Sequence, residues 1–227
     1  PFFIALGIWA ERQTQARENP LTRRDLLGIV ALGFVGYYLS SYLDFLGLQY
    51  ITASLERLIL YLNPTLVVLL GWLIYKKPVQ PIRMMAMAVS YAGVLVVFVH
   101  ELTFTGADVA LGGALVFASA LTYAVYLVFS GQLVQRIGAM RLVGWATSVA
   151  CVCCIVQFLV LRPLSAMDVP NPVLWLALLN AFACTVAPVL MVMMAIERIG
   201  AALAAQTGMI GPMATITLGV VVLDEPL

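Results

Sequence analysis

Charged residues are scarce in this sequence. Only 10% of its 227 residues are Asp, Glu, Lys or Arg, whereas 63% are hydrophobic and the mean hydropathy is +1.03. A soluble domain carries about 25% charged residues, and a chain of this size cannot hide so much apolar surface in a core of its own. The scarcity excludes a soluble globular protein and predicts that lipid is its solvent.

Histidine and cysteine are also rare, with one His and four Cys. The cysteines lie inside apolar runs with no His or carboxylate at ligand spacing, so we expect packing residues and no metal site or cofactor. No nucleophile motif or acid-base cluster suggests an enzyme. Basic residues are scattered and the net charge is +1, which argues against nucleic acid as a partner. The cysteines are Cys151, Cys153, Cys154 and Cys184.

Apolar runs of about 20 residues predict seven membrane-spanning helices, since about 20 residues cross ~30 Å of hydrocarbon. A shorter run, Pro1 to Ala10, has no basic n-region of a signal peptide and is expected to be the end of an eighth helix. The seven predicted spans are 26–48, 51–75, 82–99, 109–130, 142–161, 172–196 and 199–223.

Basic residues collect in alternate connections between these spans. Of the 12 Lys and Arg residues, Arg57 lies inside a span and Arg162 in one connection, and the other ten lie in segments 11–25, 76–83, 131–141 and 197–198. Because Lys and Arg concentrate in short cytoplasmic loops, these four segments are predicted to be cytoplasmic.

The sequence resembles itself at an offset of 148 residues. Segment 45–79 aligns without a gap with 193–227, and the offset moves each segment five helices along the chain. Because five is odd, the second copy must cross the membrane in the opposite direction. Lys76-Lys77 and Asp224-Glu225, at the ends of the two copies, agree with this inversion. The identical pairs are Ile51/Ile199, Ala53/Ala201, Leu55/Leu203, Pro64/Pro212, Leu70/Leu218, Gly71/Gly219 and Pro78/Pro226.

Inverted five-helix halves are an architecture of secondary transporters. We therefore expect an all-α, polytopic membrane helical bundle with two inverted five-helix repeats, residues 1–99 and 100–227. The offset places the partner of 109–130 before Pro1 and the partner of 82–99 after Leu227. Ten helices are thus expected in the full protein and about eight here, without the first helix, part of the second and the last.

Several segments carry a resemblance to a known family. They are Asp44-Phe45-Leu46-Gly47-Leu48-Gln49-Tyr50-Ile51, Ala53-Ser54-Leu55-Glu56-Arg57, Leu62-Asn63-Pro64-Thr65, Ile199-Gly200-Ala201-Ala202, Gly211-Pro212 and Leu223-Asp224-Glu225-Pro226-Leu227. On these segments the chain resembles the EamA-like branch of the drug/metabolite transporter superfamily over essentially its whole length. The resemblance implies a ten-helix bundle in a bacterial inner membrane that exports metabolites, amino acids or drugs through a central cavity. The family's pattern of a small residue, Glu and Pro stands as Asp224-Glu225-Pro226 but is replaced by Lys76-Lys77-Pro78 in the first half.

Three ionisable residues, Asp44, Glu56 and Arg57, lie inside predicted spans. A charged side chain there costs about 2.5–3.5 kcal/mol on insertion scales, so each needs a reason. The short turn at 49–50 makes their helices neighbours, and similar depth predicts an Asp44–Arg57 ion pair. In one interpretation this pair, or a Glu56–Arg57 pair across helices, is a structural tie whose charges cancel. In the other, Arg57 or Glu56 faces the cavity and binds a substrate's carboxylate or amine, or carries a coupling proton.

Neutral polar residues add candidates for substrate binding. Tyr61, Asn63, Tyr123, Asn180 and Gln206 lie inside spans and either contact the substrate or hydrogen-bond between helices.

Three prolines, Pro64, Pro188 and Pro212, also lie inside spans, where each removes a backbone hydrogen bond. Each either fixes a static kink or acts as a hinge for alternating access. The matched placement of Pro64 and Pro212 in the two copies adds weight to the hinge.

We expect a secondary transporter that exports a small metabolite, amino acid or drug by alternating access. The alternative is a non-transporting membrane scaffold or sensor, although no soluble domain lies between the spans. The expected partners are a small-molecule substrate and membrane lipid in an inner (plasma) membrane. Small residues such as Ala201 and Ala205 permit close helix contact and leave a homodimer open.

Overall fold

The computed structural model describes residues 2–12, 20–76, 108–167 and 169–208, with isolated positions between 81 and 96. Every regular element in this part of the chain is helical, which confirms the all-α prediction. The elements are α1 (Phe2–Glu11), α3 (Arg23–Leu32), the π-helical η1 (Gly33–Leu39), α4 (Ser40–Gly47), α5 (Ala53–Leu60), α6 (Asn63–Tyr75), α8 (Asp108–Ile137), α9 (Ala139–Leu161), the 3-10 helical η2 (Leu164–Met167), α10 (Asn171–Asn180), the π-helical η3 (Ala181–Val186), α11 (Ala187–Ile199) and α12 (Ala201–Gly208).

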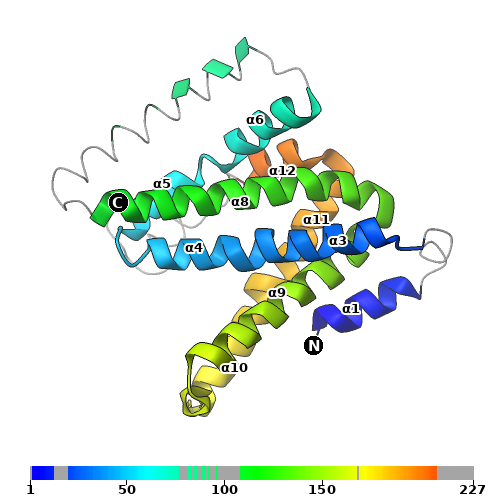
Figure 1. The fold of residues 1–227 in the computed structure, drawn as a ribbon, viewed down its shortest axis with the longest axis vertical. Helices are drawn as coiled ribbons and strands as arrows, with labels where there is room; N and C mark the ends of the chain where they lie inside the picture. The colour runs from blue at the N-terminus through cyan, green and yellow to red at the C-terminus, as the bar shows by residue number, and fades with distance from the viewer. Residues whose placement is uncertain are drawn as a thin grey trace.

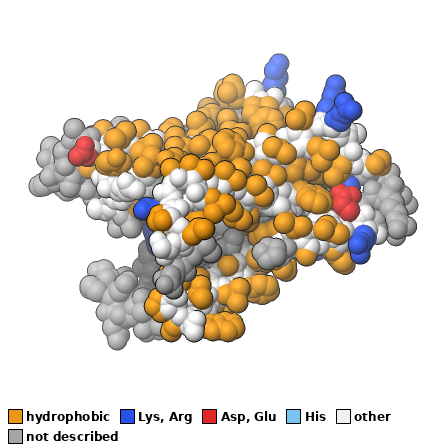
Figure 2. Space-filling view, turned by 60° about the horizontal axis from the view of Figure 1, so that its bottom comes forward, with side chains coloured by type: hydrophobic (Ala, Val, Ile, Leu, Met, Phe, Trp, Pro, Cys, Tyr) orange, Lys and Arg blue, Asp and Glu red, His pale blue; other side chains and the backbone are white. Residues whose placement is uncertain are grey.

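Five helical stretches in the described residues are long and apolar enough to cross a membrane. They correspond to the predicted spans 26–48, 51–75, 109–130, 142–161 and 172–196, whereas most of 82–99 and 199–223 lies outside the described residues. Hydrophobic side chains cover the middle of the face in Figure 2, and most of the Lys and Arg side chains in view stand near its edge. The stretches are Arg23–Gly47, Leu55–Tyr75, Asp108–Ile137, Ala139–Leu161 and Asn171–Ile199.

Two threonines begin helices in the first half. Thr22 and Asp25 form a capping box at α3, in which Thr22 N donates to Asp25 Oδ2 at 2.7 Å and Asp25 N donates to Thr22 Oγ1 at 3.4 Å. Thr52 Oγ1 accepts a hydrogen bond of 3.3 Å from Leu55 N and begins α5. Each cap satisfies backbone groups that the first helical turn leaves open.

Single glycines join two helix pairs. Gly138 separates α8 from α9 with φ +84°, and Gly200 separates α11 from α12 with φ +82°. Glycine adopts this region of φ without the steric cost that a Cβ imposes. Each pair can therefore change direction within one residue.

Helix α8 is the centre of the bundle. It packs against η1, α4, α5 and α6 from the first half and against α11 and α12 from the second, and Figure 1 shows it between α4 and α6. Its side chains Val116, Ala120, Ala124 and Val134 are completely buried. By contrast, most of the stretch Asn171–Ile199 is exposed on the outside of the described bundle.

Helix α1 packs against α9 at a very close approach. A Cβ placed on Gly144 of α9 would lie 2.6 Å from Gly7 N and 3.1 Å from Phe3 O, both backbone atoms of α1. The two backbones therefore touch where Gly7 and Gly144 meet, as small residues allow between membrane helices.

Helix bounds recur at the 148-residue offset. Adding 148 to the two ends of α3 gives the two ends of α10, and adding it to the first residues of α5 and η1 gives the first residues of α12 and η3. In Figure 1 the chain runs from right to left through α3 and α4, and from lower left to upper right through α10 and α11.

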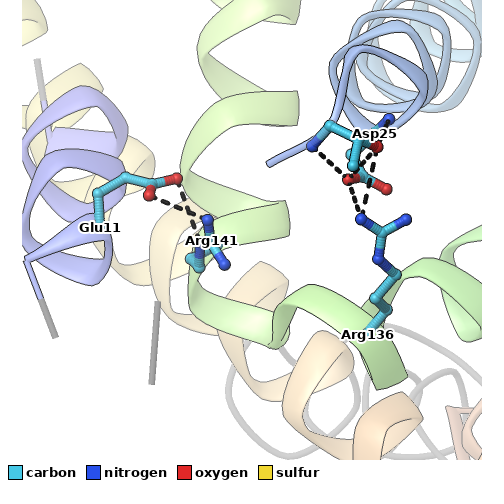
Figure 3. A network of polar contacts seen from close by, with 5 residues as sticks. Glu11, Asp25, Arg136 and Arg141 are labelled. Carbon is cyan, nitrogen blue, oxygen red and sulfur yellow. Dashed lines mark hydrogen bonds and ion pairs between the residues drawn. The ribbon is translucent and has the colours of Figure 1, made fainter. Parts of the chain in front are cut away.

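Two ion pairs join basic connections at one end of the bundle (Figure 3). Arg136 Nη2 lies 2.5 Å from Asp25 Oδ2. Arg141 donates from Nε and Nη2 to the two carboxylate oxygens of Glu11 at 3.1 and 2.9 Å. The connections after α1 and after α8 therefore lie on one side, as their shared positive charge predicts.

Candidate functional site

A cavity of about 330 Å³ lies between the two halves of the chain. The first half contributes α4, α5, the turn after α5 and α6, and the second half contributes α8, α11 and α12. Secondary transporters place their substrates at such an interface between repeats. The cavity is lined by Ser40, Ser41, Asp44, Leu60, Tyr61, Asn63, Pro64, Ser119, Tyr123, Leu127, Val192, Ala204, Ala205 and Gly208.

Among the described residues, Asp44 is the one charged residue in this lining. It lies on α4 and is half-buried, and its Oδ1 atom is shielded from solvent with no hydrogen-bond donor in reach among the described residues. A buried polar atom without a partner costs about 1–3 kcal/mol. The Asp44 carboxylate is therefore an acceptor with capacity left for a ligand.

Asn63 provides a second open acceptor from the start of α6. Its Oδ1 atom is also buried and without a donor in the described part of the chain. The turn at residues 61–62 interrupts the span between α5 and α6, and Pro64 follows in the first turn of α6, where a missing N–H costs little. The interruption thus places a polar amide inside the cavity.

Two serines that the sequence analysis did not select join α4 to α8. Ser119 Oγ donates to Ser40 O at 2.8 Å, and the two hydroxyl oxygens lie 3.2 Å apart. Both side chains are buried and both line the cavity. Ser40 lies four residues before Asp44 on the same face of its helix, and this spacing is the signal that would have found it.

Tyrosines form the aromatic part of the lining. Tyr123 stacks on Tyr126 with ring centroids 5.8 Å apart and an interplanar angle of 27°. Tyr126 in turn donates its hydroxyl hydrogen to the Tyr37 hydroxyl at 2.8 Å, which links α8 to η1. The Tyr123 ring is thereby held as one wall of the cavity, and Tyr61 contributes a second aromatic side chain.

Four predicted site residues do not line the cavity. Glu56 is buried in α5, and Arg57 beside it is exposed. Asn180 is exposed at the end of α10, and Gln206 is half-buried on α12. The cavity therefore brings together Asp44, Tyr61, Asn63 and Tyr123 of the candidates proposed from sequence.

The hinge candidates that the structure describes, Pro64 and Pro188, lie in different environments. Pro64 is buried and lines the cavity, whereas Pro188 is exposed in the first turn of α11, directly after η3. Pro212 lies outside the described residues.

The predicted Asp44–Arg57 ion pair is wrong. The ion pairs found among the described residues are Arg136–Asp25 and Arg141–Glu11. Successive helical residues point about 100° apart, so the helix rotation that buries Glu56 turns Arg57 outward.

The described residues contain no group of three or more His, Cys, Asp or Glu side chains that could hold a metal ion. The four cysteines are free thiols, three of them exposed and Cys153 half-buried.

A second cavity, of about 510 Å³, lies between α3, η1 and α8. Its charged lining residues, Asp25 and Arg136, already pair with each other, and the other lining side chains are mostly apolar. No buried polar atom without a partner lines it in the described part of the chain. The cavity at Asp44 is therefore the stronger candidate for a binding site.

Comparison with known proteins identifies the chain's relatives. The model of the EamA-like transporter family matches residues 1–99 and 110–227. The chain is 30% identical over 214 residues to the "Uncharacterized transporter YcbK" of Bacillus subtilis (strain 168). The aligned region covers 89% of this chain and 66% of that protein. No solved structure matches. This chain belongs to the EamA-like transporter family, whose members are membrane transporters.

Proposed function

We propose that this protein is a secondary transporter that moves a small organic solute across the inner (plasma) membrane by alternating access, with the cavity at Asp44 as its binding site. The observation that carries the proposal is that helices of both halves line this cavity. Family membership supports transport as the activity. We propose export as the direction and a metabolite, amino acid or drug as the cargo.

The cavity has the position that alternating access needs. Two pairs of lining residues are related by the 148-residue offset, Asp44 with Val192 and Leu60 with Gly208. Equivalent positions of the two repeats thus face one space from opposite sides. Rocking one repeat against the other would open such a space to either side of the membrane while its lining stays together.

The lining differs chemically between the two repeats although its positions correspond. Asp44 has Val192 as its counterpart, so the second repeat contributes mainly apolar wall and the first repeat contributes the charge. A solute with one polar and one apolar end therefore matches this lining better than a uniformly polar one.

Counterflow in proteoliposomes tests the proposal, because a transporter exchanges solute across a sealed bilayer and a scaffold or sensor does not. The full-length protein is used, since this chain spans about two thirds of its relative's length (66%). Cargo is first sought by growth rescue of cells exposed to a panel of metabolites, amino acid analogues and drugs. Exchange of a compound that rescues growth supports the proposal. The proposal is refuted if no compound of the panel rescues growth and none shows counterflow.

A matched pair of variants on α12 links exchange to the cavity. Ala205 lines the cavity, whereas Leu203, two residues away, is exposed on the outside of the described bundle. Ala205→Phe should fill the cavity and abolish counterflow, and Leu203→Phe should leave it unchanged at equal expression. Equal loss in both variants, or in neither, would argue against this cavity as the transport site.

A further inference from the structure

We propose that the cavity selects a protonated amine with an apolar body, and that the ammonium group binds at Asp44. This inference names the substrate class of the proposed transporter and rests on that function for its physiological role. It is carried by the charge, the open acceptors and the aromatic side chains of one cavity.

The charge of the lining has one sign. Asp44 contributes a carboxylate, and no Lys, Arg or His lines the cavity among the described residues. Arg57, the cation inside the nearest span, is exposed and makes no ion pair with Asp44. The chain from Gly200 to Leu227, which includes the cavity-lining part of α12, contains no basic residue. An anionic ligand would therefore meet repulsion at Asp44 with no lining cation to offset it.

The two buried polar atoms without a partner in the described part of the lining are both acceptors. Asp44 Oδ1 and Asn63 Oδ1 are both buried without a donor. The nearby hydroxyls of Ser40 and Ser119 are already committed to each other and to backbone carbonyls. An ammonium group brings three donors and no acceptor, so it matches acceptors of this kind and neutralises the carboxylate.

The rest of the lining suits the remainder of such a ligand. Aromatic rings attract cations through their faces, and Tyr61 and Tyr123 belong to the same lining as Asp44. Most other lining side chains are apolar, and they would contact a hydrocarbon body that extends from the ammonium group. These apolar residues are Leu60, Leu127, Val192, Ala204 and Ala205.

Equilibrium binding to the full-length protein in detergent tests this inference with three probes of one shape. Radiolabelled phenethylammonium is the cation, 3-phenylpropionate the anion and 2-phenylethanol the neutral analogue. We expect phenethylammonium to bind and 3-phenylpropionate to compete poorly. Asp44→Asn should weaken phenethylammonium binding about 10- to 100-fold, which is the effect expected when a charge-assisted hydrogen bond is lost.

The control is Asp108→Asn, which removes the same charge from an exposed position at the start of α8 outside the cavity lining. It should leave binding unchanged. Asp44→Glu keeps the charge and should retain more affinity than Asp44→Asn, which separates a lost charge from a misfolded variant. Thermal unfolding of each variant checks the fold independently.

The outcomes separate this inference from the transport proposal. Binding of phenethylammonium without counterflow would support the amine site and count against transport. Counterflow of an anionic or neutral solute that phenethylammonium does not inhibit would overturn the amine site and leave transport standing. Absence of phenethylammonium binding, or an Asp44→Asn variant that binds it like the parent protein, also overturns the amine site.

Discussion

The contact between Gly7 of α1 and Gly144 of α9 yields a sharp stability prediction. In Gly144→Ala the new Cβ would lie 2.6 Å from Gly7 N and 2.7 Å from Gly7 Cα, whereas ordinary van der Waals contact begins near 3.4 Å. Because these are backbone atoms, no side chain can rotate away. Helix α1 must therefore move from α9 by the difference, 3.4 − 2.6 = 0.8 Å.

We expect this overpacking to cost about 1–3 kcal/mol, which lowers the melting temperature of a chain of this size by roughly 2–10 °C. Tryptophan fluorescence during thermal unfolding in detergent measures it. The matched control is Gly71→Ala on α6, where a Cβ would meet no atom of the described residues within 4 Å. Ala should stabilise the helix there by about 0.5–1 kcal/mol relative to Gly. A Gly144→Ala protein that melts at or above the Gly71→Ala protein would refute the close α1–α9 contact.

Three further predictions concern polar contacts between helices. Glu11→Gln should destabilise the protein by about 1–3 kcal/mol, because the Arg141 side chain is only 6% exposed and loses a charged partner. A double-mutant cycle with Arg141→Met, measured by thermal unfolding, should show a coupling energy between Glu11 and Arg141. Asp25→Asn should destabilise the protein by about 1 kcal/mol, because it weakens the cap of α3. Arg136→Met should cost less than about 1 kcal/mol, because the Arg136 side chain is 43% exposed. Chemical denaturation that finds the Arg136 variant less stable than the Asp25 variant would contradict this. Ser119→Ala should cost about 1 kcal/mol by removing a buried bond to α4, and an unchanged unfolding midpoint would show that the bond contributes nothing.

The large-scale fold could be predicted from the sequence because membrane insertion depends on composition over long segments. Five predicted spans have membrane-length helices in the structure. The offset of 148 residues also agrees with helix starts in the structure, since α3 and α5 begin 148 residues before α10 and α12. What periodicity could not provide is the rotation of each helix. Lipid tails are as apolar as Leu, so a lipid-facing surface and a bundle-facing surface carry similar side chains.

Because the sequence does not show which way each helix is rotated, only some of the candidate site residues line the cavity. Asp44 and Arg57 have the depth and the helix adjacency that a pair needs, but burial of Glu56 leaves Arg57 on the outside. Ser40 on α4 and Ser119 on α8 are hydrogen-bonded although they lie 79 residues apart in the sequence. Nothing in either local sequence indicates that contact. Polarity inside a span therefore predicts candidates, whereas tertiary packing decides which of them share a cavity.

The two π-helical segments bear on the history of the chain. η1 begins at Gly33 and η3 at Ala181, which correspond at the 148-residue offset. A π turn closes i→i+5 hydrogen bonds and is rare, appearing mostly as a single wider turn inside an α-helix. Within these segments only Phe34 and Phe182 are identical, so shared side chains do not explain why the same turn widened twice. Duplication of one ancestral segment that already held the wider turn would place it in both copies, so the two π turns agree with the repeat found in the sequence.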